Sequence, residues 1–178
     1  MKILISLAST GFDSWFQGSQ IVDSHARPLV CFHGSNKVFS KFSEYRPAFL
    51  TPNLAYAKQY GRVIMELYLS IKKPFDTRYD RKAVQIYNEH FTKYDLARAD
   101  VKPVKLGDAI HMNHADELWS FLVENPQFGY DGIYVFEGKV SDLSHTLQSA
   151  NISIVPLHGW QIKAIDNKVC SKDLDINK

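Results

Sequence analysis

The sequence predicts an α+β fold, in which several short strands are separated by helices at irregular intervals. Apolar runs of strand length, continuous or alternating, occupy residues 29–32, 62–71, 133–136, 152–155 and 161–165. Apolar residues recur at helical spacing over 116–123, shortly before Pro126. A doubly wound sheet would require regular alternation of strands and helices, so the irregular pattern favours the α+β class.

Length and composition are those of an ordinary globular domain. The chain has 178 residues, of which 45% are hydrophobic and 22% charged, so one core can be buried without disulfides or a structural metal. The net charge of +2 argues against long-range attraction to nucleic acid or lipid, although it leaves room for a local basic groove. Cys31 and Cys170 lie in no CxxC motif, and no histidine pair has a third ligand at suitable spacing. We therefore expect no metal site.

The chain is expected to consist of one domain with short flanking segments. The predicted parts are a lead at 1–11, a domain at 12–169 and a polar tail at 170–178. Within the domain, residues 75–112 are rich in charged residues and tyrosine and show helical periodicity, which predicts a helical insertion or a lid. The apolar stretch near the start is too short for a secretory signal or a membrane span. We therefore expect a cytoplasmic protein without a membrane partner.

The run at 29–32 stops at His33, so we expect this histidine at a strand end, followed by Gly34 and Ser35. A histidine in that place has one ring nitrogen free for a hydroxyl group, and the glycine beside it leaves room for a flat ring. A turn histidine with a purely structural role would give the same local sequence, and this alternative stays open.

A second local pattern follows a polar, aromatic stretch. The apolar residues at 48–50 predict a further short strand, and Thr51 is expected to cap the helix after it. Apolar residues at helical spacing continue to Tyr60, and Gly61 then ends this short helix.

The segment SWFQGSQIVDSHARPLVCFHGS at residues 14–35 resembles ADP-ribosyltransferase-like domains found in polyvalent proteins of phages and mobile elements. The positions that carry the resemblance are Trp15, Phe16, Gly18, Ser19, Val22, Asp23, Pro28, Leu29, Val30, His33 and Gly34. The segments AFLTP with LAYAKQY, GYDGI and QIKA follow in the family's order. The resemblance thus extends from about residue 12 to about residue 166, with no counterpart for the stretch near 75–112.

The resemblance implies a split β-sandwich with peripheral helices, whose cleft binds NAD as a substrate and needs no metal. Members of the family bind NAD with a His-Tyr-Glu triad or a variant of it. His33 takes the first position and would hydrogen-bond the nicotinamide ribose, beside Gly34 and Ser35. The second position falls on Phe49, which keeps the aromatic face of the usual tyrosine and lacks its hydroxyl.

The resemblance also suggests walls for the nicotinamide pocket. Thr51 would cap the helix that carries Tyr56 and Tyr60, and Tyr60 would form a second wall. Packing of both tyrosines in the core is an equally good interpretation.

The third position of the triad maps to Gln161, which is thereby predicted to be catalytic together with His33. An amide can hydrogen-bond a ribose, but it carries no negative charge and cannot act as a general base. Lys163, two residues further along the same strand, would either meet a pyrophosphate or be an ordinary solvent lysine. Asp131 lies in the segment GYDGI that resembles the family, although an aspartate that only satisfies the backbone of its own turn would explain its presence equally well. If Gln161 were too weak for catalysis, Glu66 and Glu137 would be the acidic residues to test, but neither is predicted to be catalytic.

Three functions are compatible with this sequence. The first is mono-ADP-ribosyl transfer from NAD to a macromolecule, with release of nicotinamide; in a phage setting the acceptor would be a host protein. The second is hydrolysis of NAD by water, and the third is a domain that binds NAD or a partner without turnover. Aromatic residues and lysines around 72–105 could line a groove for a nucleic-acid acceptor, but the nearly neutral charge favours a protein.

Overall fold

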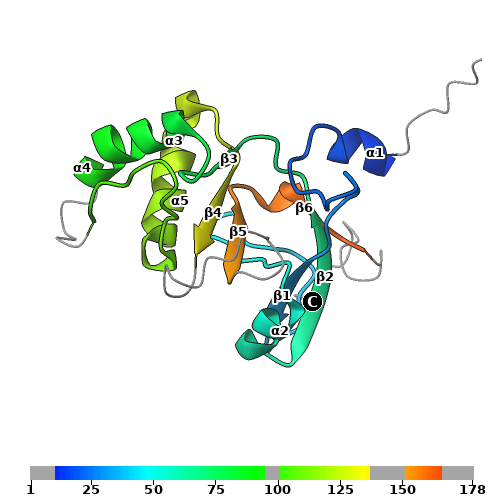
Figure 1. Ribbon diagram of the computed structural model, residues 1–178. Coiled ribbons are helices and arrows are strands. Elements are labelled where there is room, and N and C mark those ends of the chain that lie inside the picture. Colours follow the sequence, from blue (N-terminus) through cyan, green and yellow to red (C-terminus); the bar gives the residue numbers. More distant parts are fainter. Residues whose placement is uncertain (1–10, 95–100, 137–150, 166–178) are drawn as a thin grey trace, which may run out of the picture.

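Two small sheets of three strands each form the centre of the protein, and helices flank them (Figure 1). The structure, a computed structural model, describes residues 11–94, 101–136 and 151–165. The mixture of helices and short strands confirms the predicted α+β class. The predicted tail at 170–178, and all of the predicted lead except Gly11, lie outside the described residues.

The first sheet is antiparallel, with the strand order β1-β2-β6. Its strands are β1 (Cys31–Ser35), β2 (Val63–Leu69) and β6 (Ile162–Ala164). In β2 the side chains of Met65, Leu67 and Leu69 are buried, whereas Glu66 between them is exposed. Because strand side chains alternate between the two faces, one face of this sheet is turned to the core and the other outward.

The second sheet is the middle layer of the protein. Its strands are β3 (Pro74–Phe75), β4 (Gly132–Phe136) and β5 (Ile152–Pro156), with β3 parallel and β5 antiparallel to β4. Both longer strands are buried throughout. Ile133 and Val155 pack in one hydrophobic cluster with the helices, while Tyr134 and Ile154 pack in another with the first sheet. The layers are therefore helices, second sheet and first sheet (Figure 1).

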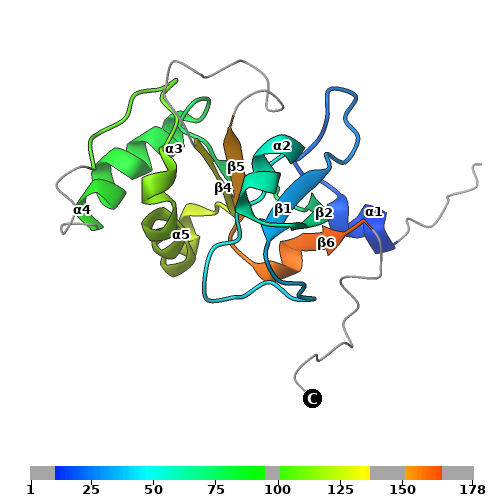
Figure 2. The same ribbon diagram turned by 90° about the horizontal axis from the view of Figure 1, so that it is seen from below.

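The helical layer lies beside the second sheet, as Figure 2 shows from below. It consists of α3 (Arg81–Ile86), a π-helical turn η2 (Tyr87–Phe91), α4 (Thr92–Tyr94), a 3-10 turn η3 (Met112–His114), α5 (Ala115–Glu124) and a 3-10 turn η4 (Pro126–Phe128). Asp80 caps α3 by accepting a hydrogen bond of 2.8 Å from the Lys82 N–H. Tyr87 and Phe91 are buried in the same cluster as α5, so the helical part of 75–112 belongs to the main core. None of the helices in the described ranges is long and apolar enough to cross a membrane.

Helix α1 (Gly11–Phe16) covers part of the outer face of the first sheet. The ring of Phe12 meets that of Tyr68 edge-on at 5.3 Å, and the Trp15 indole N–H donates to the Trp160 carbonyl at 3.1 Å. The Lys163 ammonium lies 4.6 Å from the centre of the Trp15 ring. A lysine over an aromatic face is attracted by the ring's quadrupole, so Lys163 helps to hold α1 in place.

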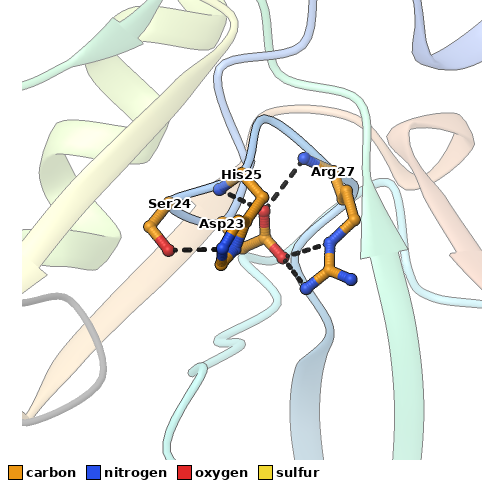
Figure 3. A network of polar contacts seen from close by, with 4 residues as sticks. All are labelled: Asp23, Ser24, His25 and Arg27. Atoms are coloured by element: carbon orange, nitrogen blue, oxygen red, sulfur yellow. Dashed lines mark hydrogen bonds and ion pairs between the residues drawn. The ribbon is translucent and has the colours of Figure 1, made fainter.

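A tight turn around Asp23 leads the chain into β1 (Figure 3). The Asp23 carboxylate accepts from the His25 and Arg27 backbone N–H groups at 2.8 and 3.0 Å, and it pairs with the Arg27 guanidinium at 2.8 Å. The Arg27 backbone hydrogen bond is the largest contribution that lowers the pKa of Asp23, to about 2. The carboxylate thus stays ionised and holds the loop whose ends, Ile21 and Leu29, are hydrogen-bonded at 3.1 Å.

Residues 49–51, which we call the bridging segment, connect the two sheets. Thr51 exchanges backbone hydrogen bonds of 2.7 and 3.0 Å with Phe32 of β1, and Leu50 exchanges bonds of 3.0 and 2.6 Å with Ile154 of β5. The predicted strand at 48–50 is therefore a pair of single bridges. The helix cap is Asn53, which accepts from the Tyr56 N–H, and the prediction of Thr51 as the cap was wrong. The Thr51 hydroxyl instead accepts from the Asn53 N–H at 3.2 Å.

A second connection between the sheets, which we call the junction, surrounds Asp131 immediately before β4. Its carboxylate accepts hydrogen bonds of 2.8 and 2.7 Å from the backbone N–H groups of Lys72 and Lys73. Its carbonyl accepts a bond of 2.8 Å from the Gln161 amide, which also donates to the Ser70 carbonyl at 3.0 Å. The carboxylate of Asp131 therefore bonds the backbone of a neighbouring segment, residues 72 and 73.

Candidate functional site

A cavity of about 210 Å³ opens at the edge of β1 that does not pair with β2. Its lining includes six of the predicted site residues: His33, Gly34, Phe49, Thr51, Tyr56 and Tyr60. It also includes four residues that the sequence analysis did not single out: Phe32, Ala57, Met112 and Ser153. No Asp or Glu belongs to this lining within the described part of the chain. The cavity is thus aromatic and neutral.

Gly34 presents its backbone to this cavity. Phe32 bonds across the free edge to Thr51, and alternate residues of an antiparallel strand face the same side. The N–H and C=O of Gly34 therefore face the same edge as those of Phe32. A Cβ at Gly34 would lie 2.0 Å from the Ala57 carbonyl oxygen, so only glycine allows this helix to pack so closely against β1.

The short helix over the cavity is α2 (Leu54–Ala57), continued by a 3-10 turn η1 (Lys58–Tyr60). Its predicted end at Gly61 is confirmed. Tyr56 is buried and Tyr60 is 48% exposed, and their hydroxyl oxygens lie 2.5 Å apart. Burial raises the pKa of Tyr60, which keeps its hydroxyl protonated. One tyrosine therefore fixes the other at the mouth of the cavity.

His33 lies in the middle of β1, and the prediction that it ends the strand was wrong. Nδ1 is 2.8 Å from the Phe49 carbonyl, an acceptor, so Nδ1 carries the proton and donates. Nε2 of the neutral ring is then an acceptor. The rings of Phe39 and Phe42 pack edge-to-face against the imidazole at 5.7 and 5.2 Å.

The pKa of His33 is lowered from its ordinary value. Burial is the main cause, and the positive charge of Arg46 adds to it, whereas the hydrogen bond to Phe49 acts in the opposite direction. The imidazole is therefore neutral at pH 7. In that state it can accept a hydrogen bond from a hydroxyl group but cannot supply a positive charge.

Ser153 and Met112 reach the cavity from other parts of the chain. Ser153 lies in β5 and is 2% exposed; the hydrogen bonds between Leu50 and Ile154 bring this strand beside the bridging segment. Met112 comes from η3, at the end of the predicted insertion. In the sequence, the signal for Ser153 was one polar residue in the apolar strand Ile152–Pro156.

Gln161, predicted to be catalytic, does not belong to the described lining of this cavity. Its side chain is fully buried and makes three hydrogen bonds. The amide nitrogen donates to the carbonyls of Ser70 and Asp131, and the amide oxygen accepts from the His158 N–H at 2.8 Å. Gln161 belongs to the 3-10 turn η6 (Gly159–Gln161) that leads into β6. All its polar atoms are thus engaged in the junction.

The remaining predicted residues are placed elsewhere. The Ser35 hydroxyl accepts from the Lys37 N–H at 3.1 Å, in the turn after β1. Glu66 is exposed on the outer face of β2, and Glu137 lies outside the described residues. Within the described ranges, no group of three or more His, Cys, Asp or Glu side chains could hold a metal ion.

Comparison with known proteins identifies one family. The model of the family described as ADP-ribosyltransferase in polyvalent proteins matches residues 23–172, which is most of the chain. No curated protein matches this sequence significantly. No solved structure does so either.

Replacing Gln161 should destabilise the protein. Gln161→Ala removes the side-chain donor to the Ser70 carbonyl and the acceptor of the His158 N–H, and it leaves the Asp131 carbonyl with only the longer bond of 3.3 Å from the Leu157 N–H; together this should cost about 2–4 kcal/mol of unfolding free energy. Gln161→Glu should cost at least as much, because it turns a carboxylate toward two carbonyl oxygens. Urea unfolding measures both variants, with the exposed Gln17→Ala as the control. Unchanged stability of Gln161→Ala would show that the junction does not depend on this side chain.

The pKa of His33 can be measured by NMR titration of the ring. We expect a value below 6.5, and removal of the neighbouring charge in Arg46→Ala should raise it. Because the folded-state pKa is lower than the unfolded one, stability should decline as the pH falls through 6.5 toward the folded-state pKa. The control is Arg81→Ala, an exposed arginine in the helical layer. A downward shift in Arg46→Ala would contradict this electrostatic account.

Proposed function

Because the chain belongs to the family of ADP-ribosyltransferases in polyvalent proteins, we propose that it transfers one ADP-ribosyl group from NAD to a macromolecule and releases nicotinamide. The observation that supports this most directly is the neutral aromatic cavity at the free edge of β1. A volume of about 210 Å³ suits a single ring with its substituent, and the rest of NAD would extend outside.

The cavity offers a recognition site for the nicotinamide group. A flat ring would lie against the aromatic side chains of Phe49 and Tyr60, which both line the cavity. The carboxamide has an NH2 group that donates and a carbonyl that accepts, and the backbone of Gly34 at the strand edge offers a carbonyl and an N–H to match them. In this proposal Phe49 supplies only stacking, because it has no hydroxyl.

The ribose next to nicotinamide would meet His33. Its Nε2 is an acceptor while Nδ1 donates to Phe49, so it can receive a hydrogen bond from a ribose hydroxyl. Fixing this hydroxyl orients the ribose relative to the acceptor, which lowers the entropic part of the barrier. Thr51 would contribute by holding the bridging segment to β1, since it is buried and its backbone bonds Phe32.

In the transfer, the bond between the nicotinamide nitrogen and ribose C1′ breaks, and its electron pair remains on neutral nicotinamide. A nucleophilic atom of the acceptor bonds to C1′ and loses its proton to solvent. A carboxylate would stabilise the positive charge that develops on the ribose, but the described lining of the cavity contains none. Ser153 provides a polar oxygen from β5 instead. We therefore propose slow turnover, with Gln161 as a positioning residue that ties the turn between β5 and β6 to Ser70 and Asp131.

We further propose a fold correspondence, an acceptor and a cellular setting. The two sheets would correspond to the halves of a split β-sandwich, and residues 12–169 to the functional domain. The acceptor would be a host protein in the cytoplasm of a phage-infected cell, whose surface one bulky anionic group can block. Met112 at the cavity favours a role for the end of the 75–112 segment as a cover.

The test is incubation of the purified protein with isotope-labelled NAD, with and without host lysate. We expect a labelled macromolecule, and about a 30-fold to 100-fold lower rate in His33→Ala, which loses a hydrogen bond at the reacting sugar. Ser153→Ala should reduce the rate as well, whereas the exposed Ser24→Ala should not.

The outcomes separate the alternatives. Release of nicotinamide to the same extent without lysate would establish an NAD glycohydrolase in place of a transferase. No consumption of NAD under any condition would contradict the proposed activity. If NAD nevertheless raised the melting temperature, the domain would bind NAD without turnover.

A further inference from the structure

A basic surface lies where the chain enters the helical layer. It is formed by residues 72–82, which run through β3 to the start of α3, and by the loop at 101–108. Figure 1 shows β3 and α3 near the top of the molecule, whereas α2, which covers the cavity, lies at the bottom. We call this surface the basic face, and it is separate from the cavity.

Hydrogen bonds hold the two segments of the basic face side by side. The Thr77 hydroxyl donates to the Asp108 carbonyl at 2.6 Å, and the Thr77 carbonyl accepts from the Gly107 N–H at 3.3 Å. Further along the helical layer, the Asn88 side chain bonds both the N–H and the carbonyl of Val104 at 2.8 Å. The loop is therefore fixed beside α3 at two points.

The positive charge of the chain is concentrated on this face. Residues 72–82 and 101–108 contain seven lysine and arginine residues and three aspartates, whereas the net charge of the whole chain is only +2. The rest of the chain is therefore net negative. Six of the seven cations are exposed and form no ion pair with another residue of the described ranges: Lys72, Lys73, Arg81, Lys82, Lys102 and Lys105. Such a surface favours a partner with many negative charges.

The three aspartates of the basic face bind groups of the protein itself. Asp76 pairs with the Arg78 guanidinium through two hydrogen bonds of 2.8 and 2.7 Å. Asp80 accepts from the Tyr130 hydroxyl at 2.7 Å, and Asp108 accepts from a backbone N–H of its own loop at 2.7 Å. None of the three forms an ion pair with one of the six exposed cations.

Lys73 is brought to the start of α3 by the same contacts. Its ammonium group lies 4.6 Å from the centre of the Tyr130 ring, whose hydroxyl donates to Asp80, the N-cap of α3. Arg81 and Lys82 follow Asp80 directly. The cations before β3 and those at the start of α3 therefore belong to one continuous surface.

Tyr79 adds an exposed aromatic ring to this surface. Its side chain is 77% exposed, and the Arg78 guanidinium lies 5.3 Å from the centre of its ring. An exposed ring among cations is suited to single-stranded nucleic acid, because an unpaired base can stack on the ring while the phosphates meet the cations. A duplex keeps its bases inside, and an acidic peptide would use the cations alone.

From the six exposed cations and the exposed ring, we infer that the basic face binds single-stranded nucleic acid. The phosphates would contact the lysines and arginines, and one base would stack on Tyr79. This binding goes beyond the proposed function and does not rest on it, because the face is separate from the cavity and needs no NAD. Contact with a polyanion depends on the local charge, so the low net charge of the chain does not oppose it.

The first experiment measures binding of a fluorescent 20-nucleotide oligothymidylate to the whole protein by anisotropy, from 50 mM NaCl upward. The quadruple variant Lys72→Gln/Lys73→Gln/Arg81→Gln/Lys82→Gln should bind at least about tenfold more weakly at 50 mM NaCl. The slope of log K against log salt should become shallower by about 2–3, because each phosphate contact of a single strand contributes about 0.7.

A matched variant removes the same charge from exposed positions elsewhere: Lys37→Gln/Lys41→Gln/Lys58→Gln/Lys93→Gln. It should bind almost as tightly as the unaltered protein, and circular dichroism checks that both variants are folded. Equal weakening in both quadruple variants would show that only the net charge matters and would overturn the inference. No binding by the unaltered protein up to about 100 μM at 50 mM NaCl would overturn it as well.

The second experiment tests the kind of polyanion. Tyr79→Ala should weaken oligothymidylate binding about tenfold, whereas Tyr79→Phe, which keeps the ring, should bind normally. A duplex of the same length should bind less tightly than the single strand. Unchanged binding by Tyr79→Ala, or a duplex bound as tightly as the single strand, would overturn the assignment to single strands. Polyglutamate of equal length bound as tightly as the oligonucleotide would assign the face to an acidic protein instead.

Discussion

The bridging segment, residues 49–51, is the constraint on which the site depends. Its four backbone hydrogen bonds join β1 of the first sheet to β5 of the second. They bring His33 of the first sheet and Ser153 of the second to the lining of one cavity. The Phe49 carbonyl also accepts the proton of His33 Nδ1, so the same segment determines which nitrogen of the imidazole is free. A local backbone connection thus sets both the shape and the chemistry of the cavity.

The junction around Asp131 joins the sheets a second time. Gln161 is suited to it because two carbonyl oxygens need donors and one N–H needs an acceptor, and a single amide supplies all three. A carboxylate could accept but not donate. This explains the amide at position 161 by the needs of the fold. A residue that aligns with a catalytic position of the family can therefore have its side chain buried in the protein interior.

Much of the fold follows from local sequence patterns. The apolar runs predicted β2, β4 and β5 nearly at their observed bounds, and helical spacing predicted α5, because these elements bury regular faces. Most cavity residues were also predicted, since β1, the bridging segment and α2 are neighbours in the sequence. Met112 and Ser153 were missed because they enter from distant elements. The hydrogen bonds of Gln161 could not be predicted, because a sequence does not show which backbone groups a buried amide will bond.

The most direct test of the central claim is an NMR measurement of nuclear Overhauser contacts between nicotinamide and the protein. If nicotinamide binds in the cavity, its ring protons should show contacts to the Met112 methyl group and to the rings of Phe49 and Tyr60, which line the cavity. Contacts confined to the surroundings of Gln161, or no contacts at saturating nicotinamide, would contradict it.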